Sequence, residues 1–171
     1  DYDKVFVPLQ KLCELDGFLH ALDESTLNAF VEQNLRKHVE CSAERARLDA
    51  GQAAELADHI IRSLNGVTLC IIERSDVNAL LCALFGVILG TRDAAASPLT
   101  KGVYKLAFNC VLRIAKNMGD VAQAVNPSVV LSLVHKYNER FDGRDVAFGD
   151  KVVKTLVHEL VTRSEPEFVW A

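Results

Sequence analysis

Apolar residues recur along this chain with the spacing of α-helices. Between Gln52 and Arg74 they stand alternately four and three positions apart, at Ala53, Ala57, Ile60, Leu64, Val67 and Ile71. That spacing places one apolar stripe along a helix of about six turns. No comparable stretch alternates strictly between apolar and polar residues, so no strand is predicted. The pattern therefore predicts an all-α protein.

Capping residues and prolines divide the chain into seven predicted helices. Pro98 and Pro127 each follow a Ser or Asn, which is the signature of a helix start. Asp23 or Ser25 is expected to cap the second helix, and Ser75 the fourth. The predicted ranges are 3–15, 25–48, 52–74, 76–91, 98–118, 127–141 and a last helix from 145 or 150 to 163.

Short connections between these long helices predict antiparallel neighbours. Helices of about 15 to 22 residues joined in this way indicate a short α-solenoid of stacked pairs, of the HEAT-repeat type. A compact helical bundle is the alternative architecture. The 171 residues fit one domain, and the abrupt ends at Asp1 and Ala171 lead us to expect a domain taken from a longer protein.

Composition narrows the classes of partner. The formal net charge of −4 disfavours bulk electrostatic binding to nucleic acid or to an anionic membrane. The longest apolar run, 79–90, is shorter than the ~20 residues that a membrane span requires. The cysteines are odd in number and lie in apolar or helical patterns, so reduced thiols in the cytosol are predicted for Cys13, Cys41, Cys70, Cys82 and Cys110.

No pattern in the sequence predicts catalysis. His158 and Glu159 begin a metalloprotease-like motif, but Thr162 stands where zinc chemistry needs a second imidazole. His38 and Cys41 could offer two metal ligands on one helix face, but no second pair accompanies them. Because phosphate-cradling glycines and a nucleophile elbow are also missing, we predict no enzyme, no cofactor site and no metal site.

One helix face is unusually basic. No acidic residue occurs between Asp93 and Asp120, where the polar positions of one helix face recur at Lys101, Lys105, Asn109, Arg113 and Lys116. Two interpretations are open. The face is either a solvated surface whose charges pair with a neighbouring helix, or a docking surface for an acidic partner.

Several segments between residues 58 and 160 carry a family resemblance. They are 59–65 (HIIRSLN), 72–76 (IERSD) with Leu80, Leu81 and Leu84, then Ala96-Ser97-Pro98, Lys105, Cys110, Leu112-Arg113 and 153–158 (VKTLVH). In this order they resemble the last folded domain of the TOG-domain microtubule polymerases, the mini spindles and ch-TOG family. The first 50 residues match that domain only in helical character.

The resemblance implies a TOG-like array of HEAT repeats in a polymerase that acts at spindle poles, centrosomes and microtubule ends. The C-terminal region of these polymerases is associated with coiled-coil TACC proteins. We therefore expect a monomeric, cytoplasmic adaptor domain that helps to target the polymerase by binding a TACC-type protein. Tubulin is the alternative partner.

The tubulin-binding domains of this family grip tubulin through a row of turns that begins with an exposed Trp and continues with Lys or Arg. Here the first turn, 16–24, lacks that Trp, since the only tryptophan is Trp170. Arg74 in the second turn and Lys116 before the third match the basic members of the row, although such residues are often merely solvated. The predicted partner-binding residues are thus Arg74, Lys101, Lys105, Arg113 and Lys116.

Overall fold

The computed structural model of the protein describes residues 3–90, 97–121, 123–141 and 147–163. Regular structure within these ranges is helical, with no strand, which confirms the predicted all-α class. The elements are α1 (Asp3–Glu14), a 3-10 turn η1 (Leu19–Ala21), α2 (Glu24–Arg45), α3 (Gln52–Arg74), α4 (Val77–Gly90), α5 (Pro98–Lys116), α6 (Met118–Val121), α7 (Pro127–Phe141) and α8 (Ala147–Arg163).

The predicted bounds hold at both ends of α3 and α7. The fifth helix ends at Lys116, two residues earlier than predicted, because the backbone leaves the helical conformation at Asn117, with φ −93° and ψ 12°. Met118 then starts the separate helix α6, which sequence analysis missed, and its side chain is fully buried.

Side-chain caps occur at the starts of α2, α4, α5 and α7, the last through the Asn126 side-chain oxygen, which accepts from the Ser128 N–H at 3.0 Å. The Asp23 carboxylate accepts from the Thr26 N–H at 2.8 Å, and the Ser97 hydroxyl accepts from the Thr100 N–H at 3.1 Å, as predicted. The expected cap of the fourth helix was wrong. Asp76 accepts from the Ala79 N–H at 2.8 Å, whereas Ser75 closes α3 through its own N–H to the Ile71 carbonyl.

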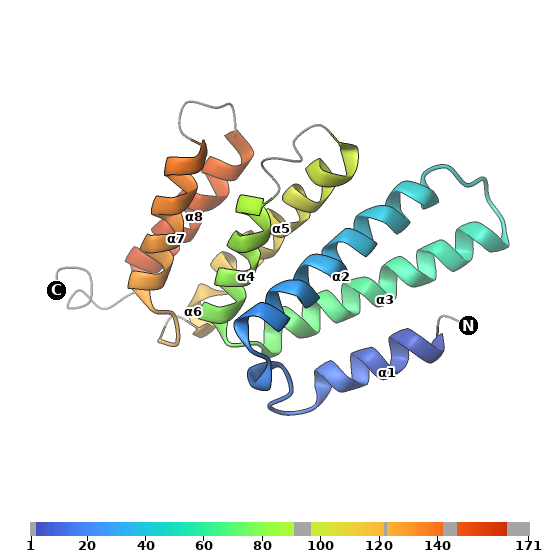
Figure 1. Cartoon of the computed structure of the whole chain (residues 1–171), viewed down its shortest axis with the longest axis horizontal. Coiled ribbons are helices and arrows are strands. Elements are labelled where there is room, and N and C mark those ends of the chain that lie inside the picture. Colours follow the sequence, from blue (N-terminus) through green and yellow to red (C-terminus); the bar gives the residue numbers. More distant parts are fainter. Residues whose placement is uncertain (1–2, 91–96, 122, 142–146, 164–171) are drawn as a thin grey trace.

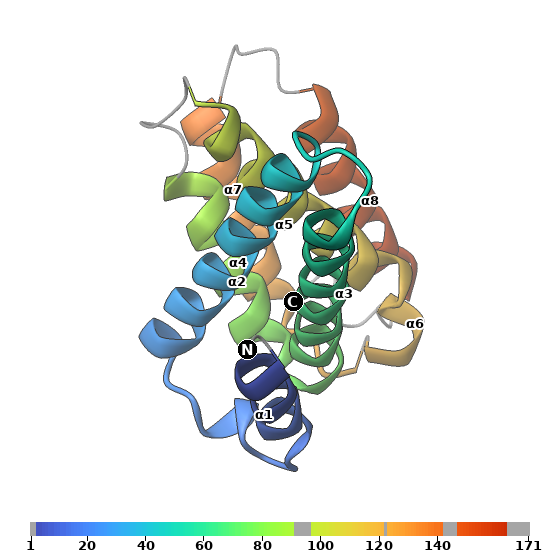
Figure 2. The same cartoon turned by 90° about the vertical axis from the view of Figure 1, so that its right-hand side faces the viewer.

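The pairs α2 with α3, α4 with α5, and α7 with α8 run antiparallel and lie side by side (Figure 1). The close neighbours in sequence are α2 with α3 and α4 with α5, while α7 and α8 touch less extensively. Helices further apart in sequence also pack, since α1 contacts α3, α2 contacts α4, α4 contacts α7, and α5 contacts α8. Seen from the side, α2 and α4 lie on one face of the molecule and α3 on the other (Figure 2).

The core centres on α4, which packs against α2, α5 and α7. This helix is apolar nearly all round because it is covered on several sides, and its buried residues include Leu80, Leu81, Leu84, Phe85 and Ile88. Aromatic rings join α5 to α7: Phe108 meets Tyr137 edge-on at 5.8 Å, and Tyr104 lies 6.0 Å from Phe141. All five cysteines are free, as predicted, with Cys13 and Cys110 buried in this core.

Candidate protein-interaction site

The basic face lies on the solvent side of α5. All five of its residues are exposed, namely Lys101, Lys105, Asn109, Arg113 and Lys116. The opposite side of the helix is buried in the core through residues that include Val103, Ala107, Val111 and Ile114. The amphipathic pattern of α5 therefore separates a packing side from a charged outer side.

Most charges on this face have no ion-pair partner among the residues that the structure describes. Arg113 Nη2 lies 3.6 Å from Glu73 Oε1, an ion pair that leaves both side chains about half exposed. Lys101, Lys105 and Lys116 form no ion pair with any residue that the structure describes. Pairing with a neighbouring helix, one of the two interpretations drawn from the sequence, thus applies to Arg113 and not to the three lysines.

A groove of about 520 Å³ runs between α3 and α5, beside the basic face. From α3 it is lined by Asn65, Thr68, Leu69 and Ile72, and from α5 and its end by Asn109, Cys110, Leu112, Arg113, Lys116 and Asn117. It exists because α2 packs against both helices, while α3 and α5 are not among the closely packed pairs. Among the residues that the structure describes, the lining combines apolar side chains, amides and two cations, and it includes no acidic residue.

The polar side chains that line this groove differ in whether they already have hydrogen-bond partners within the described part of the protein. The Asn65 side-chain oxygen lies 2.9 Å from His38 Nε2, and the Thr68 hydroxyl both accepts from Asn34 and donates to the Leu64 carbonyl. The side-chain amides of Asn109 and Asn117, both exposed, make no hydrogen bond to a described residue. These two amides can therefore donate to, and accept from, a bound molecule.

Cys110 lines the groove but does not make it reactive. Its side chain is 5% exposed, and burial raises the pKa of the thiol to about 11, although Arg113 nearby acts in the opposite direction. Since the thiolate is the nucleophile, this cysteine is a neutral, weakly polar lining group near pH 7.

Arg74, the remaining predicted partner-binding residue, makes hydrogen bonds within the molecule. Its Nη1 donates to the Glu14 carbonyl at 2.6 Å and to Asp16 Oδ1 at 3.3 Å. A cation at the last carbonyls of a helix stabilises that helix end, so Arg74 holds the C-terminus of α1 against α3. Lys116 and Arg113 thus lie together at the groove, whereas Arg74 is hydrogen-bonded to the C-terminal end of α1.

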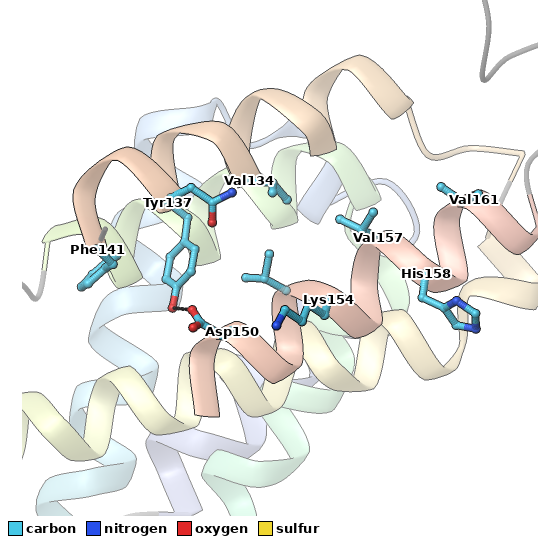
Figure 3. Close-up of a pocket in the computed structure, with 10 residues that line it drawn as sticks. Val134, Tyr137, Phe141, Asp150, Lys154, Val157, His158 and Val161 are labelled. Atoms are coloured by element: carbon cyan, nitrogen blue, oxygen red, sulfur yellow. Dashed lines mark hydrogen bonds between the residues drawn. The ribbon is translucent and has the colours of Figure 1, made fainter. Parts of the chain in front are cut away.

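A second groove, of about 610 Å³, lies between α7 and α8 (Figure 3). Its apolar lining includes Val134, Phe141, Val153, Val157 and Val161, and it also contains Asn138, Lys154 and His158. At one end Tyr137 donates its hydroxyl to Asp150 at 3.1 Å, and burial raises the pKa of that tyrosine. Sequence analysis missed this groove. The spacing of Val153, Val157 and Val161 by four residues was its only signal.

The residues discussed as metal ligands have other contacts. His38 lies within hydrogen-bonding distance of Asn65 and Ser42, and no group of three or more His, Cys, Asp or Glu side chains in the described ranges is placed to share a metal ion. None of the described helices has the combination of length and apolar character needed to cross a bilayer.

Comparison with protein-family models, with curated proteins and with solved structures gives no match for this chain. The likeness to the microtubule polymerases therefore rests on the sequence segments quoted above.

Proposed function

We propose that this chain is a non-catalytic protein-interaction domain, built as a short HEAT-type, TOG-like array of antiparallel helix pairs. The order of packing supports an array, because α1 meets α3, α2 meets α4, and, with the short helix α6 left out of the count, α4 meets α7. Contacts between helices two places apart in this way are typical of stacked helix pairs. In the alternative, a compact bundle, all helices would surround one common core.

The observation that carries the interaction role is the basic face, whose three lysines have no ion-pair partner among the described residues, beside an α3–α5 groove whose described lining has no acidic residue. Lys101, Lys105 and Lys116 form no ion pair with a described residue, in a chain whose net charge is −4. A local patch opposite in sign to the whole protein favours an acidic partner and speeds its association. Nothing in the packing of the described residues requires these lysines.

The proposed partner is a TACC-type coiled coil. Two-stranded coiled coils expose charged residues beside their apolar seam, so an acidic stretch of such a coil complements a basic helix face. By this proposal the domain helps to target a microtubule polymerase to spindle poles, centrosomes or microtubule ends.

The second candidate function is direct tubulin binding in support of polymerisation, through Arg74, Lys116 and the basic face. Acidic tubulin suits the exposed lysines. The contacts of Arg74 favour the first candidate, because binding tubulin through this guanidinium would compete with its bonds to Glu14 and Asp16.

Size-exclusion chromatography of the purified domain with a TACC coiled coil, and separately with αβ-tubulin, tests the proposal. Runs at ~0.01 M and ~0.15 M ionic strength span Debye lengths of about 30 to about 8 Å, so a contact made by surface charges weakens across them. Co-elution with the coiled coil is the expected result. Co-elution with tubulin alone would establish the second candidate, and co-elution with neither would refute both.

A further inference from the structure

The α3–α5 groove and the basic face form one continuous surface, because Asn109, Arg113 and Lys116 belong to both. We propose that this surface binds an acidic polypeptide segment that also carries apolar side chains. The inference rests on the proposed function, and it names the site and the chemistry of the segment that the partner supplies.

The lining of the groove determines that chemistry. Leu69, Ile72 and Leu112 are each only partly buried, so an apolar side chain placed over them would complete their removal from water. A purely charged segment would leave this apolar surface uncovered. A purely apolar segment would leave the cations at the rim without partners.

Charge determines the sign of the partner. The described part of the lining contains Arg113 and Lys116 and no acidic residue, and Lys105 extends the same exposed face along α5. Glu73, which is not among the lining residues, is paired with Arg113. Carboxylates on the bound segment would therefore meet two unpaired lysines, and the free amides of Asn109 and Asn117 would meet its backbone.

The α7–α8 groove does not carry the same proposal. It is of similar size, but its polar lining mixes Lys154 with Asp150 and so does not select one charge. The control variants below are taken instead from exposed positions on α1 and α7 that line neither groove.

NMR titration of the ¹⁵N-labelled domain with a 16-residue peptide tests the inference. The probe is Glu-rich with two leucines four positions apart, and the same peptide with Lys in place of every Glu is its control. We expect the acidic peptide to shift amide signals of α3 and α5, including the side-chain amides of Asn109 and Asn117, and the basic peptide to shift none of them. Absence of binding at low salt, or shifts confined to α7 and α8, would overturn the inference.

Two variants sharpen the result. The double reversal Lys105→Glu/Lys116→Glu is expected to weaken binding at least tenfold, and Leu69→Ala at least threefold. The controls are Lys11→Glu/Lys136→Glu, which makes the same change in net charge on α1 and α7, and Leu131→Ala, which truncates a leucine that is 55% exposed. Controls should stay within twofold of the unaltered domain, and equal losses in variants and controls would refute the site.

The two proposals fail in different ways. Peptide binding in the groove without co-elution of either a TACC coiled coil or tubulin would refute the proposed function and leave the groove assignment standing. Binding of the coiled coil that is unaffected by Lys105→Glu/Lys116→Glu would refute the groove assignment and leave the proposed function standing.

Discussion

The Glu73 carboxylate lies 3.6 Å from the Arg113 guanidinium and so joins α3 to α5 where their C-terminal parts approach each other. Both side chains are substantially exposed, so the pair contributes little to stability, of order 0–1 kcal/mol. The ion pair matters more for the proposed peptide binding, because it involves Arg113, one of the two cations that line the groove. Glu73 thus competes with any carboxylate that a partner brings to Arg113.

Removal of this competition is expected to strengthen binding. In Glu73→Gln the arginine loses its intramolecular partner and gains freedom to pair with the acidic peptide, so we predict a two- to fivefold lower dissociation constant in the NMR titration. The thermal midpoint should barely change. Weaker binding by this variant would show that Glu73 orients Arg113 rather than competing for it.

Asn78 fastens α4 to the segment before α7. Its side-chain amide donates to the Ala124 carbonyl at 2.8 Å, and its oxygen accepts from the Asn126 N–H at 2.7 Å. Asn78→Ala leaves both backbone groups without these partners, which is expected to lower the free energy of unfolding by about 1–3 kcal/mol in urea denaturation. Asn138→Ala, at an exposed position on α7 with no hydrogen bond to a described residue, should change it by less than ~0.5 kcal/mol.

Gly102 allows α2 and α5 to approach. A Cβ atom at this position would lie 2.5 Å from Cγ1 of Val39, a stiff β-branched side chain that cannot easily move aside. Gly102→Ala should therefore destabilise the fold by about 1–3 kcal/mol despite its better helix propensity. Gly90→Ala is the matched control, since a Cβ there meets nothing within 4 Å and the thermal midpoint should hold or rise. Equal midpoints for the two variants would contradict the packing of α2 on α5.

The Cys110 thiol is expected to resist alkylation. Because burial raises its pKa to about 11, from an ordinary value of 9.0, iodoacetamide should modify it slowly at pH 7 to 8 and faster only as the pH approaches 11. The unfolded chain releases this proton at lower pH than the folded one, so the contribution of Cys110 to stability is complete below about pH 9 and declines above it. Mass spectrometry of alkylated peptides measures the rate, and rapid labelling of the native domain at pH 7 would contradict the burial.

The helices were predictable where periodicity and end signals agree. In α3 the apolar spacing runs almost without interruption from Gly51 to Ser75, and in α7 Asn126 and Pro127 mark the start. The predicted cap of the fourth helix was wrong because Ser75 and Asp76 are both good capping residues. The sequence does not reveal which of the two precedes the first residue of α4. Helix α6 was missed because its start depends on burial of Met118 by distant helices.

The candidate site was predictable only in part. Spacing alone placed Lys101, Lys105 and Lys116 on one face, because that face is a property of a single helix. The groove depends on the separation between α3 and α5. That separation is set by α2, which packs against both helices. The partners of Arg74 come from 58 and 60 positions away in the sequence, and no local pattern indicates them.

The most direct test of the account is the dissociation constant for a TACC coiled coil, measured by isothermal titration calorimetry with Lys105→Glu/Lys116→Glu and with its control Lys11→Glu/Lys136→Glu. Both variants change the net charge equally, so a difference between them reports the place of the charge and not its amount. The account predicts binding at least tenfold weaker for the α5 variant and within twofold of the unaltered domain for the control. Equal affinities in the two variants, or no binding by the unaltered domain, would contradict it.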